Sequence, residues 1–139
     1  MIQQTLYISR AVHFMQEKDL EAILTYSRES NSRHAITGLL LYGSGHFYQI
    51  LEGSKANVHS LLERIRRDNR HVDLTVIAER DVEDRVFPKW WMGFRSLGPS
   101  EFADDPAFHN IRTASDLLKI PGAGDKLFKV MYAMYTSLP

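Results

Sequence analysis

Two apolar segments joined by a Gly-Ser-Gly turn constrain the fold of this chain more than any other feature. Residues 35–42 (AITGLLLY) are almost continuously apolar, and residues 46–52 (HFYQILE) follow directly after the glycines at 43 and 45. A short apolar run without polar alternation is typical of a strand covered on both faces. Glycines between two such runs favour a tight turn, so we predict a β-hairpin inside a sheet.

A strand and a helix are predicted before this hairpin. Residues 4–12 are rich in β-favouring side chains and predict a first strand. Residues 19–30 predict a helix that begins at Asp19 as its N-cap. The spacing i, i+3, i+4, i+7 marks its buried stripe, which is formed by Leu20, Ile23, Leu24 and Ser27.

A second helix and a fourth strand are predicted after the hairpin. The helix follows Gly53-Ser54, and residues 71–79 alternate as a strand. Its buried stripe comprises Val58, Leu61, Leu62 and Ile65. The order β-α-β-β-α-β is that of the split βαβ, or ferredoxin-like, plan, so we expect an α+β fold.

The plan leaves one face of the four-stranded sheet bare, and the rest of the chain offers a cover for it. Residues 85–97 predict a bend at Pro88 and a short fifth strand at the sheet edge, and two apolar stripes indicate C-terminal helices on the bare face. The stripes comprise Phe108, Ile111, Ser115 and Leu118, and then Leu127, Phe128, Met131, Met134, Tyr135 and Leu138. We therefore expect a core over residues 1–97, and a connector and helical extension over residues 98–139.

Composition excludes several classes of function. The 17 Lys and Arg balance 17 Asp and Glu, so general binding to nucleic acid or anionic membranes is disfavoured. The absence of Cys excludes disulfides and thiolate chemistry, and the six His are scattered without the spacing of metal ligands. Neither a secretory signal nor an apolar run long enough for a bilayer is present, so a cytoplasmic location is expected.

Gln49 is unusual because it lies in the middle of a strand that is otherwise aromatic and aliphatic. Burying an amide without partners costs roughly 1–3 kcal/mol. Gln49 therefore either faces water or a backbone group, or contacts a polar ligand. Tyr7 lies in the middle of the first strand, which neighbours the third strand in this plan, so the two side chains can meet beneath a groove between the helices.

The ends of both helices add polar residues beside this groove: Ser27, Ser30 and Asn31, and then Arg64, Asp68 and Arg70. Asn31 is able to donate to and accept from the edge of a heterocycle. Arg64 and Asp68 are equally compatible with a surface ion pair at i, i+4. Trp90 and Trp91 form either one packed and one exposed aromatic at a strand edge, or a wall beside a planar ligand.

Five segments together resemble the BLUF family, which comprises flavin-based sensors of blue light. They are LYISRAV, the Ser-Arg-x-x-Asn of residues 27–31, ITGLLLYGSGHFYQILEG, RIRRDNRH and FPKWWMGF, and they span about residues 3–97. The resemblance implies an FAD cofactor, Tyr7 as the photo-oxidised tyrosine, Gln49 as the switching glutamine, and photoactive roles for Trp90 and Met92. It also implies flavin contacts for Ser27, Arg28, Asn31, Gln49, Arg64, Asp68, Arg70 and His71. Ser30 stands where some members have Asn.

The resemblance implies a light receptor rather than an enzyme. Light would drive electron and proton transfer from Tyr7 to the flavin, and their return would leave Gln49 rearranged and the absorption shifted to the red. The signal would then pass through the fifth strand and the C-terminal helices to a protein partner, and the apolar tail favours a homo-oligomer. The alternative is a ferredoxin-like module that binds a small molecule, or a small enzyme, without photochemistry.

Overall fold

The computed structural model describes residues 1–13, 15–88, 90–94, 114–120 and 122–137; in α1 and β5, several of the side chains are not described. The elements are β1 (Ile2–Ala11), α1 (Glu17–Arg33), β2 (Thr37–Gly43), β3 (His46–Gly53), α2 (Lys55–Arg66), β4 (His71–Val82), β5 (Trp90–Phe94), the 3₁₀ helix η3 (Ala114–Lys119) and α3 (Lys126–Ser137). The expected boundary near residue 97 lies outside the described residues.

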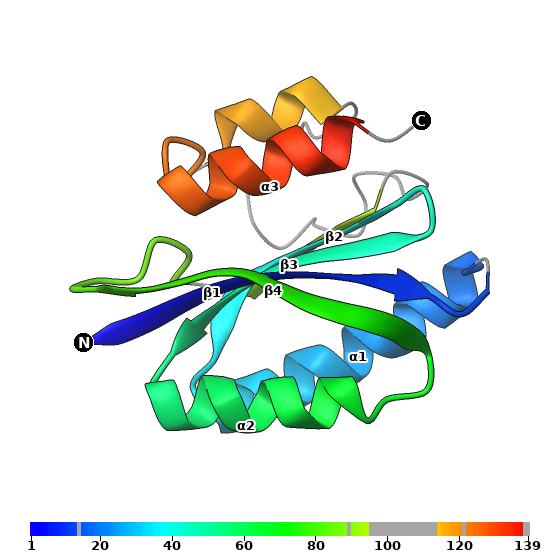
Figure 1. Cartoon of the computed structure of the whole chain (residues 1–139), viewed down its shortest axis with the longest axis horizontal. Helices are drawn as coiled ribbons and strands as arrows, with labels where there is room; N and C mark the ends of the chain where they lie inside the picture. Colours follow the sequence, from blue (N-terminus) through cyan, green and yellow to red (C-terminus); the bar gives the residue numbers. More distant parts are fainter. Residues whose placement is uncertain (14, 89, 95–113, 121, 138–139) are drawn as a thin grey trace.

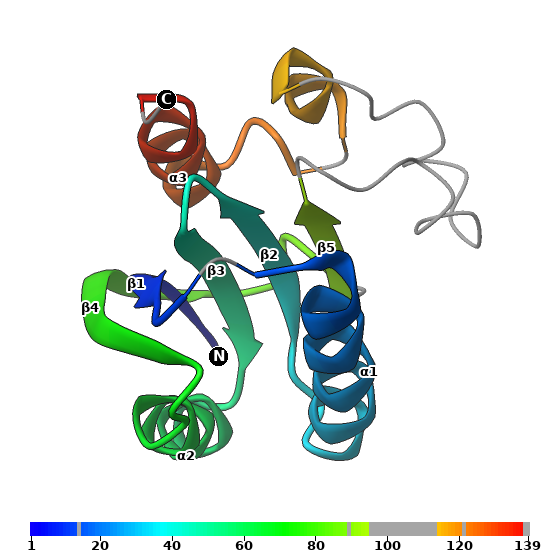
Figure 2. The same cartoon turned by 90° about the vertical axis from the view of Figure 1, so that its right-hand side faces the viewer.

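The sheet confirms the predicted ferredoxin-like α+β plan. Its five strands lie in the order β4-β1-β3-β2-β5, with β1 and β3 as neighbours at the centre. Pairs among β1 to β4 are antiparallel, whereas the additional strand β5 lies parallel to β2 at the edge. Both crossovers place their helices, α1 and α2, on one face (Figure 1). The opposite face is covered by α3 and the 3₁₀ helix, as expected for the tail (Figure 2).

The predicted hairpin is formed by β2 and β3. Gly43 pairs with His46, which leaves Ser44 and Gly45 as the two turn residues. Both have positive φ, at 52° and 78°, as a type I′ turn requires. Along β2 every residue from Gly38 to Gly43 is buried, because helices cover the strand on both sides.

Helix α2 begins as the sequence indicates, while the start of α1 differs. The Ser54 hydroxyl caps α2 by accepting from the Asn57 N–H at 3.2 Å. Helix α1 begins at Glu17, so the prediction that Asp19 is its N-cap was wrong. Asp19 lies in the first turn, and its carboxylate reaches back to the Gln16 N–H at 3.0 Å. This contact is the returning half of a capping box, in which an acidic residue three positions into a helix satisfies the backbone of the cap residue.

The C-terminal stripes are partly confirmed. In α3 the predicted residues Leu127, Phe128, Met131 and Tyr135 are buried. The first stripe is not an α-helical one where it is described, because residues 114–119 form a 3₁₀ helix. Leu117 and Ile120 are buried there, whereas the predicted Leu118 is 51% exposed. A 3₁₀ helix has three residues per turn, so positions 117 and 120 lie above one another.

Candidate functional site

A pocket lies between α1 and α2 on the sheet face that these helices cover. Its empty volume is about 580 Å³, which includes open solvent at its mouth. The floor is formed by side chains of β1, β2 and β3, and the segment after α2 forms part of the wall. The lining residues are Tyr7, Ile23, Tyr26, Ser27, Ser30, Asn31, Leu40, Phe47, Gln49, Leu61, Ile65, Asp68, Arg70 and His71.

Tyr7 and Gln49 meet in the floor of this pocket. They are register partners on the two central strands, and the Tyr7 hydroxyl donates a hydrogen bond to Gln49 Oε1. Their exposed fractions are 3% and 4%, so neither amide nor phenol faces bulk water. Burial, together with the negative charge of Asp68, raises the pKa of Tyr7 above its usual value of 10.0. The phenol is therefore neutral and keeps its proton for the bond to Gln49.

Asn31 is held at the end of α1 with its side chain against the pocket. Its backbone carbonyl accepts from the His34 and Ile36 N–H groups, at 3.2 and 2.9 Å, which fixes the exit from the helix. Among the residues that the structure describes, the Asn31 side-chain amide makes no hydrogen bond, and the residue lines the pocket. Asn31 thus presents a free donor and acceptor to anything that fills the pocket.

Arg64 connects the two helices. Its Nη1 donates to Ser30 Oγ at 3.3 Å, and its buried Nε has no partner among the described residues. The alternative ion pair between Arg64 and Asp68 is not formed. Asp68 pairs with Arg70 instead, because α2 ends at Arg66 and the turn that follows directs Asp68 forward along the chain.

The Asp68–Arg70 pair and His71 lie at one side of the pocket. Arg70 Nε is 3.0 Å from both Asp68 oxygens, and Nη2 is 2.5 Å from Oδ2. Partial burial raises the pKa of Asp68, but the hydrogen bonds and charge of Arg70 outweigh this and lower it. His71 Nδ1 lies 2.8 Å from Ser9 Oγ, and burial lowers the pKa of its imidazole. An ionised pair and a neutral imidazole therefore line this side.

Three predicted site residues lie wholly or partly outside this description. The side chains of Arg28, Trp90 and Met92 are not described. The backbone of β5 places Trp90 opposite Gly38, and Met92 opposite Leu40, which lines the pocket. The strand expected to carry these two residues therefore runs beside the pocket floor.

The predicted site omitted the apolar part of the pocket lining. Leu61 and Ile65 were assigned only to the buried stripe of the second helix, and Ile23 to that of the first. Leu40 and Phe47 belong to the hairpin, and Tyr26 lies on α1. A helical stripe that packs on a sheet also forms the wall of any groove beside it, so periodicity alone does not separate core residues from lining residues.

The lining fits a flat heteroaromatic ring. Aliphatic and aromatic side chains supply apolar contact, while Gln49, Asn31 and the Asp68–Arg70 pair supply hydrogen bonds and charge for polar edges. Within the described ranges, no group of His, Asp and Glu side chains is arranged to hold a metal ion. The described helices also include none long and apolar enough to cross a membrane.

A family model described as "BLUF: Sensors of blue-light using FAD" matches residues 2–93 of the chain. The chain belongs to the BLUF family. The match includes both central strands, both helices that flank the pocket and most of β5. Pocket, fold and family thus agree on a flavin-binding sensor of blue light.

Known proteins with a BLUF domain include both short and multidomain chains. The chain is 42% identical over 85 residues to the photoactivated adenylate cyclase subunit beta of Euglena gracilis, which covers 61% of this chain and 10% of that protein. The dark-state structure of the BLUF protein BlrB aligns at a TM-score of 0.69 and 27% identity, and covers 96% of both chains. Klebsiella pneumoniae BlrP1, in a manganese and cyclic diGMP complex, aligns at 0.72 and 26% identity, over 98% of this chain and 33% of that one.

The chain spans only about a tenth of the length of the cyclase subunit it matches. The similarity therefore concerns the light-sensing domain and does not extend cyclase activity to these residues. The BLUF assignment therefore supports a photoreceptor domain, rather than an enzyme, for these 139 residues.

Proposed function

We propose that this BLUF domain binds FAD non-covalently between α1 and α2 and signals the absorption of blue light through Gln49. The observation that carries the proposal is the hydrogen bond from the Tyr7 hydroxyl to Gln49 Oε1 in the pocket floor. A phenol and an amide are thereby paired at the point where the polar edge of a ring would lie. The free amide of Asn31 supports the same placement of the ligand.

Excited flavin, when bound, is a strong electron acceptor. Tyr7 would be the donor of one electron to the flavin, and because its phenol is neutral, the proton that now lies in the bond to Gln49 would follow to the flavin. Both return to Tyr7 afterwards, so no net oxidation occurs. The change that remains is the arrangement of the Gln49 amide.

Gln49 suits this role because an amide has a donor end and an acceptor end. In the structure its Oε1 accepts from Tyr7. A half-turn of the side chain, or a tautomeric shift, exchanges the two ends without moving the backbone of β3. The hydroxyl of Tyr7 can donate or accept, so it remains bonded in either arrangement. The exchange would change the hydrogen bond between Gln49 and the ring, and the absorption of the ring would shift to the red.

The other predicted contacts hold the cofactor. Asn31 binds the carbonyl edge of the ring, and the charged groups near the mouth bind its remaining polar parts. Asp68, Arg70 and His71 line the pocket, as does Ser27 from α1, whereas Arg64 and Arg28 are further contacts that we infer from the family resemblance. Arg64 has an unpartnered buried Nε for such a contact, and Asp68 fixes the direction of the Arg70 guanidinium.

The signal leaves the pocket through β5. Trp90 and Met92 lie on this strand, which pairs with β2 beside the pocket, and the covering helix α3 lies on the other sheet face. A change in β5 and in the packing of the C-terminal helices then alters the binding of a protein partner. We expect a homo-oligomer in the cytoplasm that contacts neither nucleic acid nor membrane directly.

Absorption spectroscopy tests the proposal. The purified protein should be yellow, its spectrum should shift to the red under blue light, and it should recover in the dark. Chromatography of the cofactor released by denaturation distinguishes FAD from FMN. A colourless protein that cannot be reconstituted with either flavin would instead favour a ferredoxin-like module that binds another small molecule.

A further inference from the structure

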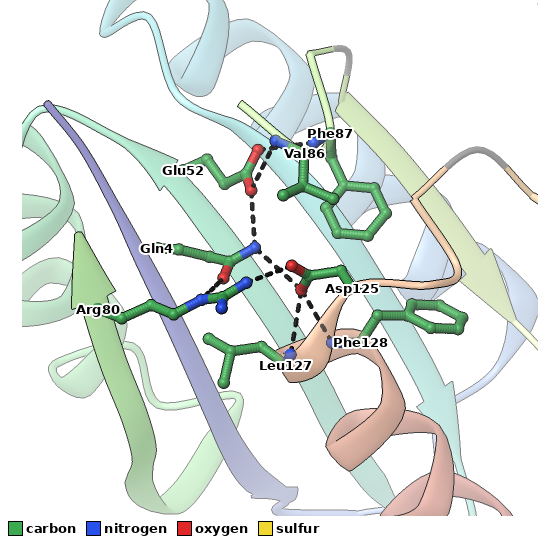
Figure 3. A network of polar contacts seen from close by, with 8 residues as sticks. All are labelled: Gln4, Glu52, Arg80, Val86, Phe87, Asp125, Leu127 and Phe128. Atoms are coloured by element: carbon green, nitrogen blue, oxygen red, sulfur yellow. Dashed lines mark hydrogen bonds and ion pairs between the residues drawn. The ribbon is translucent and has the colours of Figure 1, made fainter. Parts of the chain in front are cut away.

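A buried polar cluster lies on the sheet face opposite the flavin pocket. It comprises Gln4 on β1, Glu52 on β3, Arg80 on β4 and Asp125 directly before α3, and Figure 3 shows it from close by. Gln4 is the register partner of both Glu52 and Arg80. Gln4 and Glu52 are 0% exposed, so their polar atoms depend on partners within the protein. We call these four residues the Gln4 cluster.

Gln4 bridges the two carboxylates of the cluster. Its Nε2 donates to Glu52 Oε2 at 2.8 Å and to Asp125 Oδ2 at 3.2 Å. Its Oε1 accepts from Arg80 Nε at 2.7 Å, and Arg80 Nη2 also pairs with Asp125 Oδ1. Arg can only donate and ionised carboxylates can only accept, so the Gln4 amide has one permitted orientation. It is a fixed connection, in contrast to Gln49, whose hydroxyl partner can donate or accept.

One side of the cluster holds the segment that enters β5. Glu52 Oε1 accepts from the Phe87 N–H at 2.7 Å, and Oε2 accepts from the Val86 N–H at 3.1 Å. Burial raises the pKa of Glu52, and these N–H donors oppose the rise by binding the ionised form. Displacement of the segment would therefore leave a buried carboxylate short of donors. Its bond to Gln4 would change with it.

The other side of the cluster holds the start of α3. Asp125 Oδ2 accepts from the Leu127 and Phe128 N–H groups, both at 3.1 Å, and so caps the helix. The same oxygen accepts from Gln4. Gln4 and Arg80 thus connect the cap of α3 to the central strand β1 and its neighbour β4. Within the cluster, hydrogen bonds join Glu52 to Asp125 only by way of Gln4.

We propose that Gln4 is a positioning residue that joins the segment entering β5 to the N-terminus of α3. Disturbance of Glu52 then loosens α3, although in the described part of the chain Glu52 makes no hydrogen bond to α3 itself. In the dark this is a property of the folded domain alone. As a route for the light signal it rests on the proposed function, because only photochemistry at the flavin would displace β5.

Hydrogen exchange in the dark tests whether Gln4 connects Glu52 to α3. The variants are Gln4→Met, which keeps the volume and removes the bridge, Glu52→Gln, and the double variant. We expect each single variant to accelerate exchange of the α3 amides by about tenfold relative to those of α2, as for the loss of a buried hydrogen bond. The double variant should exchange no faster than Gln4→Met, because Glu52 acts through Gln4.

The control is Gln3→Met, a buried amide one residue earlier that faces the other way and contacts His59 at 3.4 Å. It should leave α3 exchange unchanged. If Gln4→Met does not fold, Arg80→Met replaces it, because the Arg80 side chain is 34% exposed and its loss also removes donors from Gln4 and Asp125. The double variant of Arg80→Met and Glu52→Gln should then exchange its α3 amides no faster than Arg80→Met alone.

Two results would overturn the proposal. One is unchanged α3 exchange in Glu52→Gln, and the other is multiplication of the two single effects in the double variant, which would show that they act separately. The exchange is measured in the dark and does not depend on photochemistry. Absence of the red shift would therefore refute the proposed function, while the exchange rates of the variants would still test the role of Gln4.

Discussion

Tyr7 and Gln49 are paired across the two central strands, and the phenol donates a hydrogen bond to the amide oxygen inside a pocket between two helices. The strands fix the backbones of both residues, so only side-chain rearrangement can change this contact. It is therefore a local element with two possible arrangements, embedded in a rigid sheet. That combination suits a switch whose output must be reproducible.

Removal of the Tyr7 hydroxyl should abolish the photocycle and spare the pocket. Tyr7→Phe retains the ring that fills the floor but has no proton to donate to Gln49. We expect a yellow protein whose flavin spectrum under blue light lacks the reversible red shift. Tyr26→Phe removes the hydroxyl of a pocket-lining tyrosine that is 54% exposed; it is the matched control and should retain the shift. A normal photocycle in Tyr7→Phe would contradict the assignment of the donor.

Replacement of the Gln49 amide tests the switch itself. Gln49→Leu keeps a side chain of similar size without a donor or an acceptor, so we expect bound flavin and no light-induced red shift. Gln3→Leu removes another buried amide that does not line the pocket, and it should shift normally. Difference spectra before and after illumination distinguish the two. Persistence of the shift in Gln49→Leu would show that another group reports the light.

Asn31 should contribute to flavin affinity. Its side-chain amide lacks a protein partner among the described residues, so its removal leaves nothing in the protein unpaired. Asn31→Ala should weaken binding by about tenfold, the effect of one hydrogen bond to a ligand. Asn57→Ala, whose amide donates to the His34 carbonyl at 3.0 Å on the surface, provides the comparison in a fluorescence titration. Equal affinities would place the flavin edge elsewhere.

The buried imidazole of His71 should make stability depend on pH. Its pKa is lowered from 6.5 by burial, so the unfolded chain binds this proton more tightly than the folded protein. The contribution of the neutral imidazole is complete above pH 6.5 and is lost as the pH falls below that value. Urea unfolding at several pH values should show a smaller acid loss in His71→Gln than in the original protein. Parallel curves would mean that His71 titrates equally in both states.

Gly38 should tolerate no side chain. Its φ is 150°, and an added Cβ would lie 1.9 Å from the Ile50 carbonyl oxygen on the paired strand. Gly38→Ala should therefore lower the free energy of unfolding by about 2–4 kcal/mol through overpacking and backbone strain. Gly124→Ala has open space around its Cβ and should change stability little. Chemical unfolding of both variants measures the difference.

Local pattern was enough to predict the order of the elements and the central neighbours of the sheet. The hairpin from residues 35–52 was predictable because its apolar runs and glycines act over a few residues. The position of Tyr7 opposite Gln49 was expected in outline, since the ferredoxin-like plan makes their strands adjacent. The flavin family was indicated by five segments of the chain, and its model covers all of their residues except Phe94.

Two details depart from what regular helical spacing offered. Asp68 bonds Arg70 rather than Arg64, because the end of α2 sets which cation it reaches. The first tail segment is 3₁₀ where described, which turns Leu117 inward and Leu118 outward. Periodicity assumes a regular helix, so it cannot predict such a change of pitch.

The sequence by itself determined which residues carry polar groups within apolar strands, and it directed attention to Gln49. By the same argument Gln4 and Glu52 were unusual, but nothing near them along the chain supplies their partners. Only the tertiary structure brings Arg80 and Asp125 to Gln4, across 76 and 121 positions of the sequence respectively. Contacts at such separation depend on strand register and on the docking of α3. A linear pattern encodes neither, because each is set by the packing of the whole domain.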